Sequence, residues 1–200
     1  MRRKIRIVLS LIIVIIAIFG YAHISKTHAI YDRTIDPSEY GSVTANPDTT
    51  LEQSFVSEEN CLDGIRIKGS ENGDISQVYI HYTLKEMSTQ KQVAEGEINA
   101  KEALSRQFYE LPFQRIEGCN GEAYILQVEQ YTTDQESSVS FMYERKAEEN
   151  TNMLVDAEEI DGTVVMKTVT KRFDLETFFV VLVFAVYIMF FIRLLYKLFK

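Results

Sequence analysis

The chain has 200 residues, 46% of them hydrophobic, and a formal net charge of -8. The charge is unevenly distributed, because all 29 Asp and Glu and 14 of the Lys and Arg lie in residues 7 to 192, whereas the charged residues of the two ends are all basic. A strongly acidic middle repels phosphate backbones, which excludes nucleic acid as an expected partner and leaves neutral sugars, cations and basic protein surfaces.

The first apolar segment covers residues 7–24 and follows a basic tip at residues 1–6. No charged residue occurs from Ile7 to Ala22, and at about 1.5 Å per residue a helix of this length just crosses a bilayer. The basic tip predicts a cytoplasmic N-terminus. A cleaved signal peptide is the alternative, because Gly20-Tyr21-Ala22 places small residues at the two positions that signal peptidase recognises.

A second apolar segment at residues 175–196 is followed by a basic tip at residues 197–200. Both segments predict the same two-pass topology, with the termini in the cytoplasm and the intervening residues outside it. Tyr187 falls near the middle of the second segment. Its hydroxyl either bonds to its own backbone on a lipid-facing helix or contacts a partner helix, since an unpaired hydroxyl is costly in hydrocarbon.

Between the two segments, residues 25–50 are polar and weakly periodic, and we interpret them as a membrane-proximal tether. Residues 51–172 show short apolar stretches separated by turn residues, which predicts an antiparallel sandwich or barrel. The clearest stretch is 77–85, where apolar and polar residues alternate. The expected strands are 51–56, 62–68, 77–85, 92–99, 108–113, 123–130, 138–144 and 163–170, with a helical turn at 102–107.

The two cysteines, Cys61 and Cys119, each precede an expected strand. Outside the cytoplasm an even number of cysteines usually indicates pairing, so we predict a disulfide between them. Such a bridge contributes on the order of 3 to 4 kcal/mol by restricting the unfolded chain. Free buried thiols are the alternative.

Several strand motifs resemble a galactose-binding-like jelly-roll domain found in bacterial membrane proteins of cell-surface polysaccharide synthesis. The resemblance covers residues 51–170 and consists mainly of core and turn positions. These motifs are Leu51-x-Gln53-x-Phe55, Leu62-x-Gly64-Ile65-x-Ile67, Val78 to Leu84, Tyr109-x-Leu111-x-Phe113, Gly121-x-x-Tyr124-x-Leu126-x-Val128 and Asp161-Gly162.

The resemblance implies a jelly-roll sandwich in the bacterial cell membrane, and such domains often carry one structural calcium ion. No dense Asp/Asn/Gly calcium loop occurs here, so the sequence predicts no cofactor and no metal ligands. Family members often belong to large polytopic glycosyltransferase-like proteins. This chain has two apolar segments and no catalytic membrane region, which implies an accessory role.

The sequence offers no arrangement typical of an enzyme. His81 is the single histidine of the predicted domain, and the acidic pairs at 58–59, 148–149 and 158–159 lie in polar connections. No zinc spacing, glycine-rich phosphate loop or nucleophile elbow occurs. We therefore expect a protein without catalytic activity.

The outward sides of two strands provide the candidate ligand-binding residues, which are Tyr79, His81, Gln127 and Glu129. If these strands share a sheet, the residues form a surface suited to carbohydrate. The alternative is that the other sheet or a loop covers this surface, in which case Tyr79 is a packing residue. We expect a membrane-anchored module that binds or positions carbohydrate; the alternative is a subunit that docks on a larger membrane protein through its β-domain and second helix.

Overall fold

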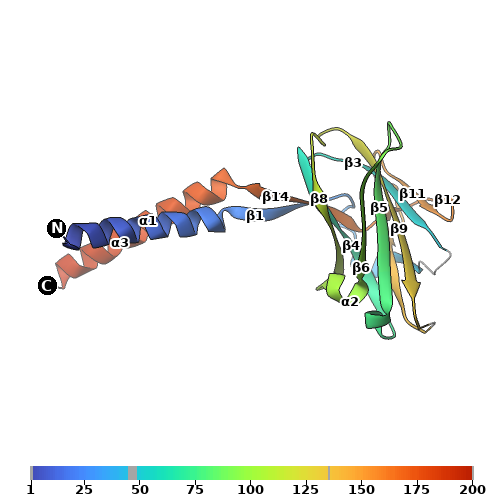
Figure 1. The fold of residues 1–200 in the computed structure, drawn as a ribbon, viewed down its shortest axis with the longest axis horizontal. Coiled ribbons are helices and arrows are strands. Elements are labelled where there is room, and N and C mark those ends of the chain that lie inside the picture. Colours follow the sequence, from blue (N-terminus) through green and yellow to red (C-terminus); the bar gives the residue numbers. More distant parts are fainter. Residues whose placement is uncertain (1, 45–48, 135, 200) are drawn as a thin grey trace. The chain divides into compact units, whose positions relative to one another are not determined.

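The computed structural model describes residues 2–44, 49–134 and 136–199, with the backbone alone described for residues 2–8, 10 and 11. The chain divides into two compact units. One unit contains residues Met1–Lys26 and Lys171–Lys200, and the other contains Thr27–Thr170. The second unit is a β-sandwich of two sheets, as Figure 1 shows.

One layer of the sandwich is a six-stranded sheet with the order β12-β11-β3-β9-β5-β6, in which every pair of neighbours is antiparallel. Its strands alternate between buried and half-exposed residues, most regularly in β5 and β9. The strands are β3 (Leu51–Val56), β5 (Val78–Glu86), β6 (Gln92–Asn99), β9 (Ala123–Thr132), β11 (Asn152–Val155) and β12 (Glu158–Ile160).

The other layer is an eight-stranded sheet whose main path is β1-β14-β4-β10-β13. Strand β2 pairs with β10, and the β7–β8 hairpin pairs with β4 through β8. The strands are β1 (His23–Ala29), β2 (Gly41–Thr44), β4 (Cys61–Asn72), β7 (Leu104–Ser105), β8 (Phe108–Glu117), β10 (Ser138–Glu144), β13 (Thr163–Val164) and β14 (Met166–Phe173).

The core lies between the two sheets and is formed by the inward-facing residues of both. Burial of these side chains is the main contribution to the stability of such a sandwich. The largest fully buried side chains are Tyr109, Phe55, Phe141, Leu51, Leu62, Ile65, Ile67, Ile80, Leu84, Leu111, Leu126 and Met153.

Two buried glutamines connect the sheets across this apolar core. The Gln53 Oε1 on β3 accepts a hydrogen bond from the Val164 backbone N–H on β13 at 2.8 Å. The Gln130 Oε1 on β9 accepts one from the Val139 backbone N–H on β10 at 2.9 Å. Because a buried amide without a partner is costly, these contacts fix how the two layers pair.

Short helical elements occupy three of the connections, and an Asp or Asn side chain caps each at its first turn. The caps follow the usual preference for short polar side chains at the first turn of a helix. These elements are η1 (Pro37–Glu39), η2 (Ile75–Gln77) and α2 (Ala100–Ala103), capped by Asp36, Asp74 and Asn99 respectively.

The interpretation of residues 25–50 as a plain tether is incorrect, since β1 and β2 lie within or overlap this range and pair in the eight-stranded sheet. β2 pairs antiparallel with β10, with Val43 opposite Phe141. Strands β11 and β12 were also not expected. β1, β2 and β12 are largely polar, and β11 is only four residues long, so their alternation is too weak to stand out from loop sequence.

The predicted disulfide is not formed, because Cys61 and Cys119 are both free thiols. The sequence places them correctly near each other, since the Cys119 backbone N–H bonds to the carbonyl of Asn60, the neighbour of Cys61, at 3.1 Å. The Cys119 Sγ instead donates to the Ile116 carbonyl at 3.1 Å. Burial raises the pKa of the Cys61 thiol, which keeps it protonated at neutral pH.

The unit outside the sandwich contains two helices, α1 (Arg2–Tyr21) and α3 (Leu175–Leu198). In the part of the chain that the structure describes, α3 alone is long and apolar enough to cross a membrane. In α1, the apolar stretch whose side chains are described is Ile12–Tyr21, which is shorter than α3. The helix ends at Tyr21, before the predicted limit at residue 24. The two-pass arrangement therefore stays a prediction.

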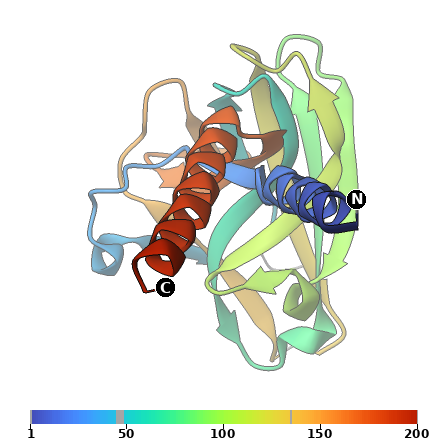
Figure 2. The same ribbon diagram turned by 90° about the vertical axis from the view of Figure 1, so that its left-hand side faces the viewer.

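The two helices converge at the ends that are joined to β1 and β14 (Figure 2). The Asp174 backbone N–H donates to the Ala22 carbonyl at 2.8 Å, and the Asp174 carboxylate caps α3 by accepting from Thr177. Lys26 Nζ lies 2.9 Å from the same carboxylate. Hydrogen bonds from Thr177 and Lys26 hold the pKa of Asp174 at about 2, so this cap stays charged at physiological pH.

Candidate functional site

The candidate residues from the sequence lie together on one surface. Strands β5 and β9 are direct neighbours, and their register places His81 opposite Glu129 and Tyr79 opposite Tyr131. Gln127 follows on the same side of β9, opposite Thr83. Because these residues face away from the core and are half-exposed, the other sheet does not cover them. We call this outward surface of β3, β9, β5 and β6 the β5–β9 face.

An aromatic pair marks one end of the β5–β9 face. The rings of Tyr79 and Tyr131 stack with centroids 5.3 Å apart and an angle of 9° between their planes. Tyr131 is 39% exposed, and the carboxylate of Glu97 raises its pKa to about 12. Tyr131 was missed in the sequence because the expected strand ended at residue 130. Extending the alternation of Gln127 and Glu129 by one step would have found it.

A chain of hydrogen bonds crosses the middle of the β5–β9 face. Lys85 Nζ donates to Gln127 Oε1 at 3.1 Å, and Gln127 Nε2 donates to Glu129 Oε1 at 2.8 Å. Thr50 Oγ1 donates to the same Glu129 oxygen at 3.1 Å. These contacts hold the amide and the carboxylate in fixed positions, as is needed for polar groups that orient a ligand.

His81 lies in the same face and contacts the neighbouring strand. Its Nε2 is 3.2 Å from Glu95 Oε1, and Gln92 Nε2 donates to the other Glu95 oxygen at 2.6 Å. Hydrogen bonds from His81, and then from Gln92, lower the pKa of Glu95. The His81 side chain is 34% exposed. It therefore makes a structural contact with Glu95 and also leaves a polar edge of the ring open to solvent.

In residues 2–44, 49–134 and 136–199, no group of three or more His, Cys, Asp or Glu side chains is placed to hold a metal ion.

The fold and the helix together define the chain as a mostly β antiparallel sandwich protein with one helix, among the described residues, that is long and apolar enough to span a membrane. No protein-family model and no curated protein sequence matches it. Among solved structures, one similar chain comprises the cysteine protease and lectin-like domains of Cwp84, a surface-layer-associated protein of Clostridium difficile. The alignment has 12% identity and a TM-score of 0.39, and covers 68% of this chain and 37% of that one.

A second similar structure is the VP2 subviral particle of infectious bursal disease virus, with 8% identity and a TM-score of 0.25 over 74% of this chain and 37% of that chain. This chain therefore spans little more than a third of either protein's length. Neither similarity assigns a family to this chain.

Proposed function

We propose that this chain is a non-catalytic membrane-anchored module that binds neutral carbohydrate on the outside of a bacterial cell and positions it during assembly of cell-surface polysaccharide. The observation that carries the proposal is the stacked pair Tyr79–Tyr131 on the same face as His81, Gln127 and Glu129. The predicted galactose-binding-like jelly roll belongs to this proposal, as does its expected accessory role.

The chemistry of the β5–β9 face suits a sugar. Pyranose rings combine an apolar face of C–H groups with equatorial hydroxyls, so they bind where an aromatic ring lies beside planar polar groups. Tyr79 and Tyr131 supply the aromatic surface, while the Gln127 amide and the Glu129 carboxylate supply hydrogen-bond partners at fixed positions. The nearby carboxylates disfavour anionic sugars, which is why the proposal specifies a neutral glycan.

The anchoring part of the proposal rests on α3, whose 24 residues form a helix long and apolar enough to cross a membrane. Arg193, Lys197 and Lys200 follow the apolar residues, which favours a cytoplasmic C-terminus under the positive-inside rule. The basic residues at the start of α1 favour the same side for the N-terminus, so a two-pass topology with the sandwich outside the cytoplasm is proposed.

The test is binding of the full chain, in nanodiscs of neutral lipid, to an array of neutral bacterial polysaccharides. We expect saturable binding to a subset of glycans. Tyr79→Ala and Tyr131→Ala should each weaken that binding by about tenfold or more, because each removes an aromatic contact.

Tyr40→Ala is the matched control, since Tyr40 lies beside Lys68 on the eight-stranded sheet and not on the β5–β9 face. The proposal fails if the folded chain binds no neutral glycan, or if the Tyr79 and Tyr40 variants bind equally well.

The alternative function is that of a subunit docked on a larger membrane protein, and one feature of α3 favours it. An apolar hollow of about 520 Å³ is lined by Phe179, Val180, Val183, Phe184 and Tyr187. The Tyr187 side chain is 60% exposed, with its ring stacked on Phe191 at 6.1 Å. The occupant would be an apolar transmembrane helix that offers an acceptor to the Tyr187 hydroxyl.

A photo-crosslinking residue placed at position 187 in cells tests this alternative, with position 189 on the other side of the helix as control. Adducts to one defined membrane protein from 187 but not from 189 would support docking. Equal labelling of lipid from both positions would contradict it.

A further inference from the structure

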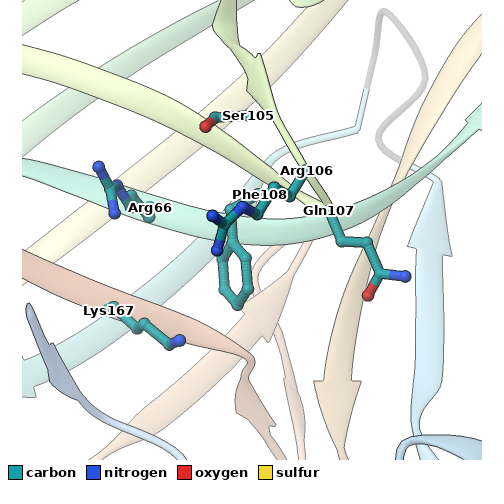
Figure 3. Close-up of a pocket in the computed structure, with 6 residues that line it drawn as sticks. All are labelled: Arg66, Ser105, Arg106, Gln107, Phe108 and Lys167. Atoms are coloured by element: carbon teal, nitrogen blue, oxygen red, sulfur yellow. The ribbon is translucent and has the colours of Figure 1, made fainter.

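A hollow of about 740 Å³ lies on the eight-stranded sheet, away from the β5–β9 face. Figure 3 shows its six lining residues, with two arginines and a lysine around the Phe108 ring. The lining residues are Arg66, Ser105, Arg106, Gln107, Phe108 and Lys167. Half of them are cations, although the chain as a whole has a net charge of -8. We call this site the basic hollow.

Strand register explains why the cations gather there. Lys167 on β14 lies directly opposite Arg66 on β4, and Lys68 on β4 lies opposite Phe108 on β8. Residues 66 and 68 both face outward, since side chains of a strand alternate between its two sides. The turn between β7 and β8 adds Arg106 at the rim. Segments far apart in the sequence therefore build one basic surface.

The basic hollow is short of negative charge. Arg66 has a carboxylate partner, Glu110, at 2.7 Å, yet its Nε is buried without a hydrogen-bond partner among the described residues. Across the same described ranges, no carboxylate lies within ion-pair distance of Lys167, Lys68 or Arg106. Like charges held together without counter-charge repel one another, and a bound anion would relieve this repulsion.

Lys167 experiences this repulsion most directly. Its Nζ lies 4.5 Å from the centroid of the Phe108 ring and 6.0 Å from that of Tyr31. Burial lowers the pKa of Lys167, and the positive charges of Arg33, Arg66 and Lys68 lower it further. The ammonium is thus held on aromatic rings, near three further cations, at a site where an anion would stabilise its charged form.

The backbone at Arg106 is also unusual. Its φ of +63° lies in the left-handed region, which glycine adopts without strain and arginine does not. A variant with glycine at this turn should therefore fold at least as well as the parent protein. Replacing Arg106 by glycine removes one cation of the hollow without removing a conformation that the fold needs, which makes this position suitable for a clean test.

We propose that the basic hollow binds a phosphate-type oxyanion carried by a small molecule or by a lipid headgroup. A phosphate monoester carries a charge of about -1.5 to -2 and three acceptor oxygens, which matches several converging cations better than a single carboxylate does. Ser105 and Gln107 add uncharged polar side chains to the lining. The hollow is much larger than a phosphate group, so the phosphate would be one end of a larger ligand. The proposal does not depend on glycan binding at the β5–β9 face.

The first experiment titrates inorganic phosphate and glycerol phosphate into the full chain in nanodiscs of neutral lipid, with binding followed by NMR of the lysine and arginine side chains. We expect saturable shifts of the Lys167 and Arg66 signals. Arg106→Gly combined with Lys167→Ala should weaken binding by about tenfold or more, because each change removes a charge-assisted contact.

Lys91→Ala with Lys101→Ala is the matched control, since it removes the same charge from residues outside the hollow and should leave binding within about twofold. Thermal unfolding of each variant shows whether the sandwich is intact, and Arg106→Gly alone keeps the test valid if the double variant does not fold. The proposal is overturned if phosphate causes no saturable shift, or if the hollow and control variants bind alike.

A second arm distinguishes the two sources of the phosphate. The same titration is repeated in nanodiscs that contain phosphatidic acid. If a lipid headgroup occupies the hollow, glycerol phosphate should bind at least about tenfold more weakly there than in neutral nanodiscs. Unchanged affinity assigns the hollow to a soluble phosphate compound, and either result is consistent with an oxyanion site.

Discussion

The outer surfaces of the two sheets carry opposite charge on a shared core. The β5–β9 face holds several carboxylates with Lys85 as a cation among them, whereas the basic hollow gathers cations around Phe108 with Glu110 as a carboxylate beside them. The carboxylates of the first surface belong to Glu52, Glu95, Glu97 and Glu129. Strand alternation keeps these charges out of the core and free to differ from one side to the other.

This difference shows that the net charge of the domain does not by itself determine which ligands a local surface can bind. The acidic middle of the chain disfavours a long polyanion, which must contact an extended surface. A single phosphate group interacts with charges within about one Debye length, roughly 8 Å at physiological ionic strength. The basic hollow is therefore compatible with an acidic domain, and the two surfaces are expected to select ligands of different charge.

The largest expected effect comes from breaking the link between the two sheets. Gln53→Ala removes the acceptor of the buried Val164 N–H and the donor to the Ser54 and Asn152 carbonyls, and leaves a cavity. We expect the free energy of unfolding to fall by about 4 kcal/mol. Because both surfaces rest on this core, both binding activities should weaken together, as measured by thermal unfolding and by the two titrations.

The matched control is Gln127→Ala, which removes the same amide from the half-exposed β5–β9 face. Its effect on the free energy of unfolding should stay within about 0.5 kcal/mol, and phosphate binding should not change. Equal destabilisation by the two substitutions would show that the sheets are not joined through Gln53.

A second prediction concerns pH and depends on a buried carboxyl group of the eight-stranded sheet. Glu144 on β10 is fully buried and accepts the Asp32 backbone N–H at 3.1 and 3.2 Å. Burial, with the charges of Glu148 and Asp32, raises its pKa from 4.5 to about 7, against the opposing effects of the Asp32 backbone hydrogen bond and of Lys146. The folded state thus binds a proton more tightly than the unfolded state does.

Protonated Glu144 contributes to the free energy of unfolding. This contribution is fully present below pH 4.5 and is lost as the pH rises to about 7. The loss should be about 3 kcal/mol. Hydrogen bonds from Thr34 lower the pKa of Asp32, so its own titration lies below this window. Glu144→Gln should remove the decline in unfolding temperature between pH 5 and pH 8, and an unchanged decline in this variant would refute the assignment.

Sequence reasoning located the strands that alternate strongly, and it failed where alternation is short or polar. The bounds of β3, β6 and β10 agree with the expected strands, and those of β5 and β9, which alternate most regularly, differ from them by one or two residues. β1 and β2 were interpreted as a tether because their pairing partners are far away in the sequence. The partner of β1 is β14, more than a hundred residues away, and the partner of β2 is β10, about a hundred residues away. A local sequence pattern contains no information about a strand-pairing partner so far away in the chain.

The same physical distinction applies to the two surfaces. Alternation alone placed Tyr79 and His81 on the outward side of one strand and Gln127 and Glu129 on that of another. The structure shows that these two strands are neighbours. The basic hollow could not be predicted, because residues 66, 106 and 167 become neighbours only through strand register and a turn. Proximity of the two cysteines was predictable, whereas the orientation of the Cys119 thiol was not.

The smallest expected effect is on the β5–β9 face itself. His81→Ala removes one exposed contact to Glu95, and exposed ion pairs contribute little, so the unfolding temperature should change by no more than about 1 °C. The pKa of Glu95 should rise, since His81 is the main group that lowers it, and NMR titration of the carboxylate measures this. His81→Gln, which keeps a donor, should restore part of the shift.

A large loss of stability in His81→Ala would mean that the β5–β9 face is part of the structural framework and is not a free surface. The small effect expected here would leave His81 available as a hydrogen-bond partner for a ligand. In that case His81→Ala should weaken glycan binding while phosphate binding at the basic hollow stays unchanged. Loss of both activities at constant stability would show that the two surfaces are coupled, in contrast to their separate positions on opposite sheets.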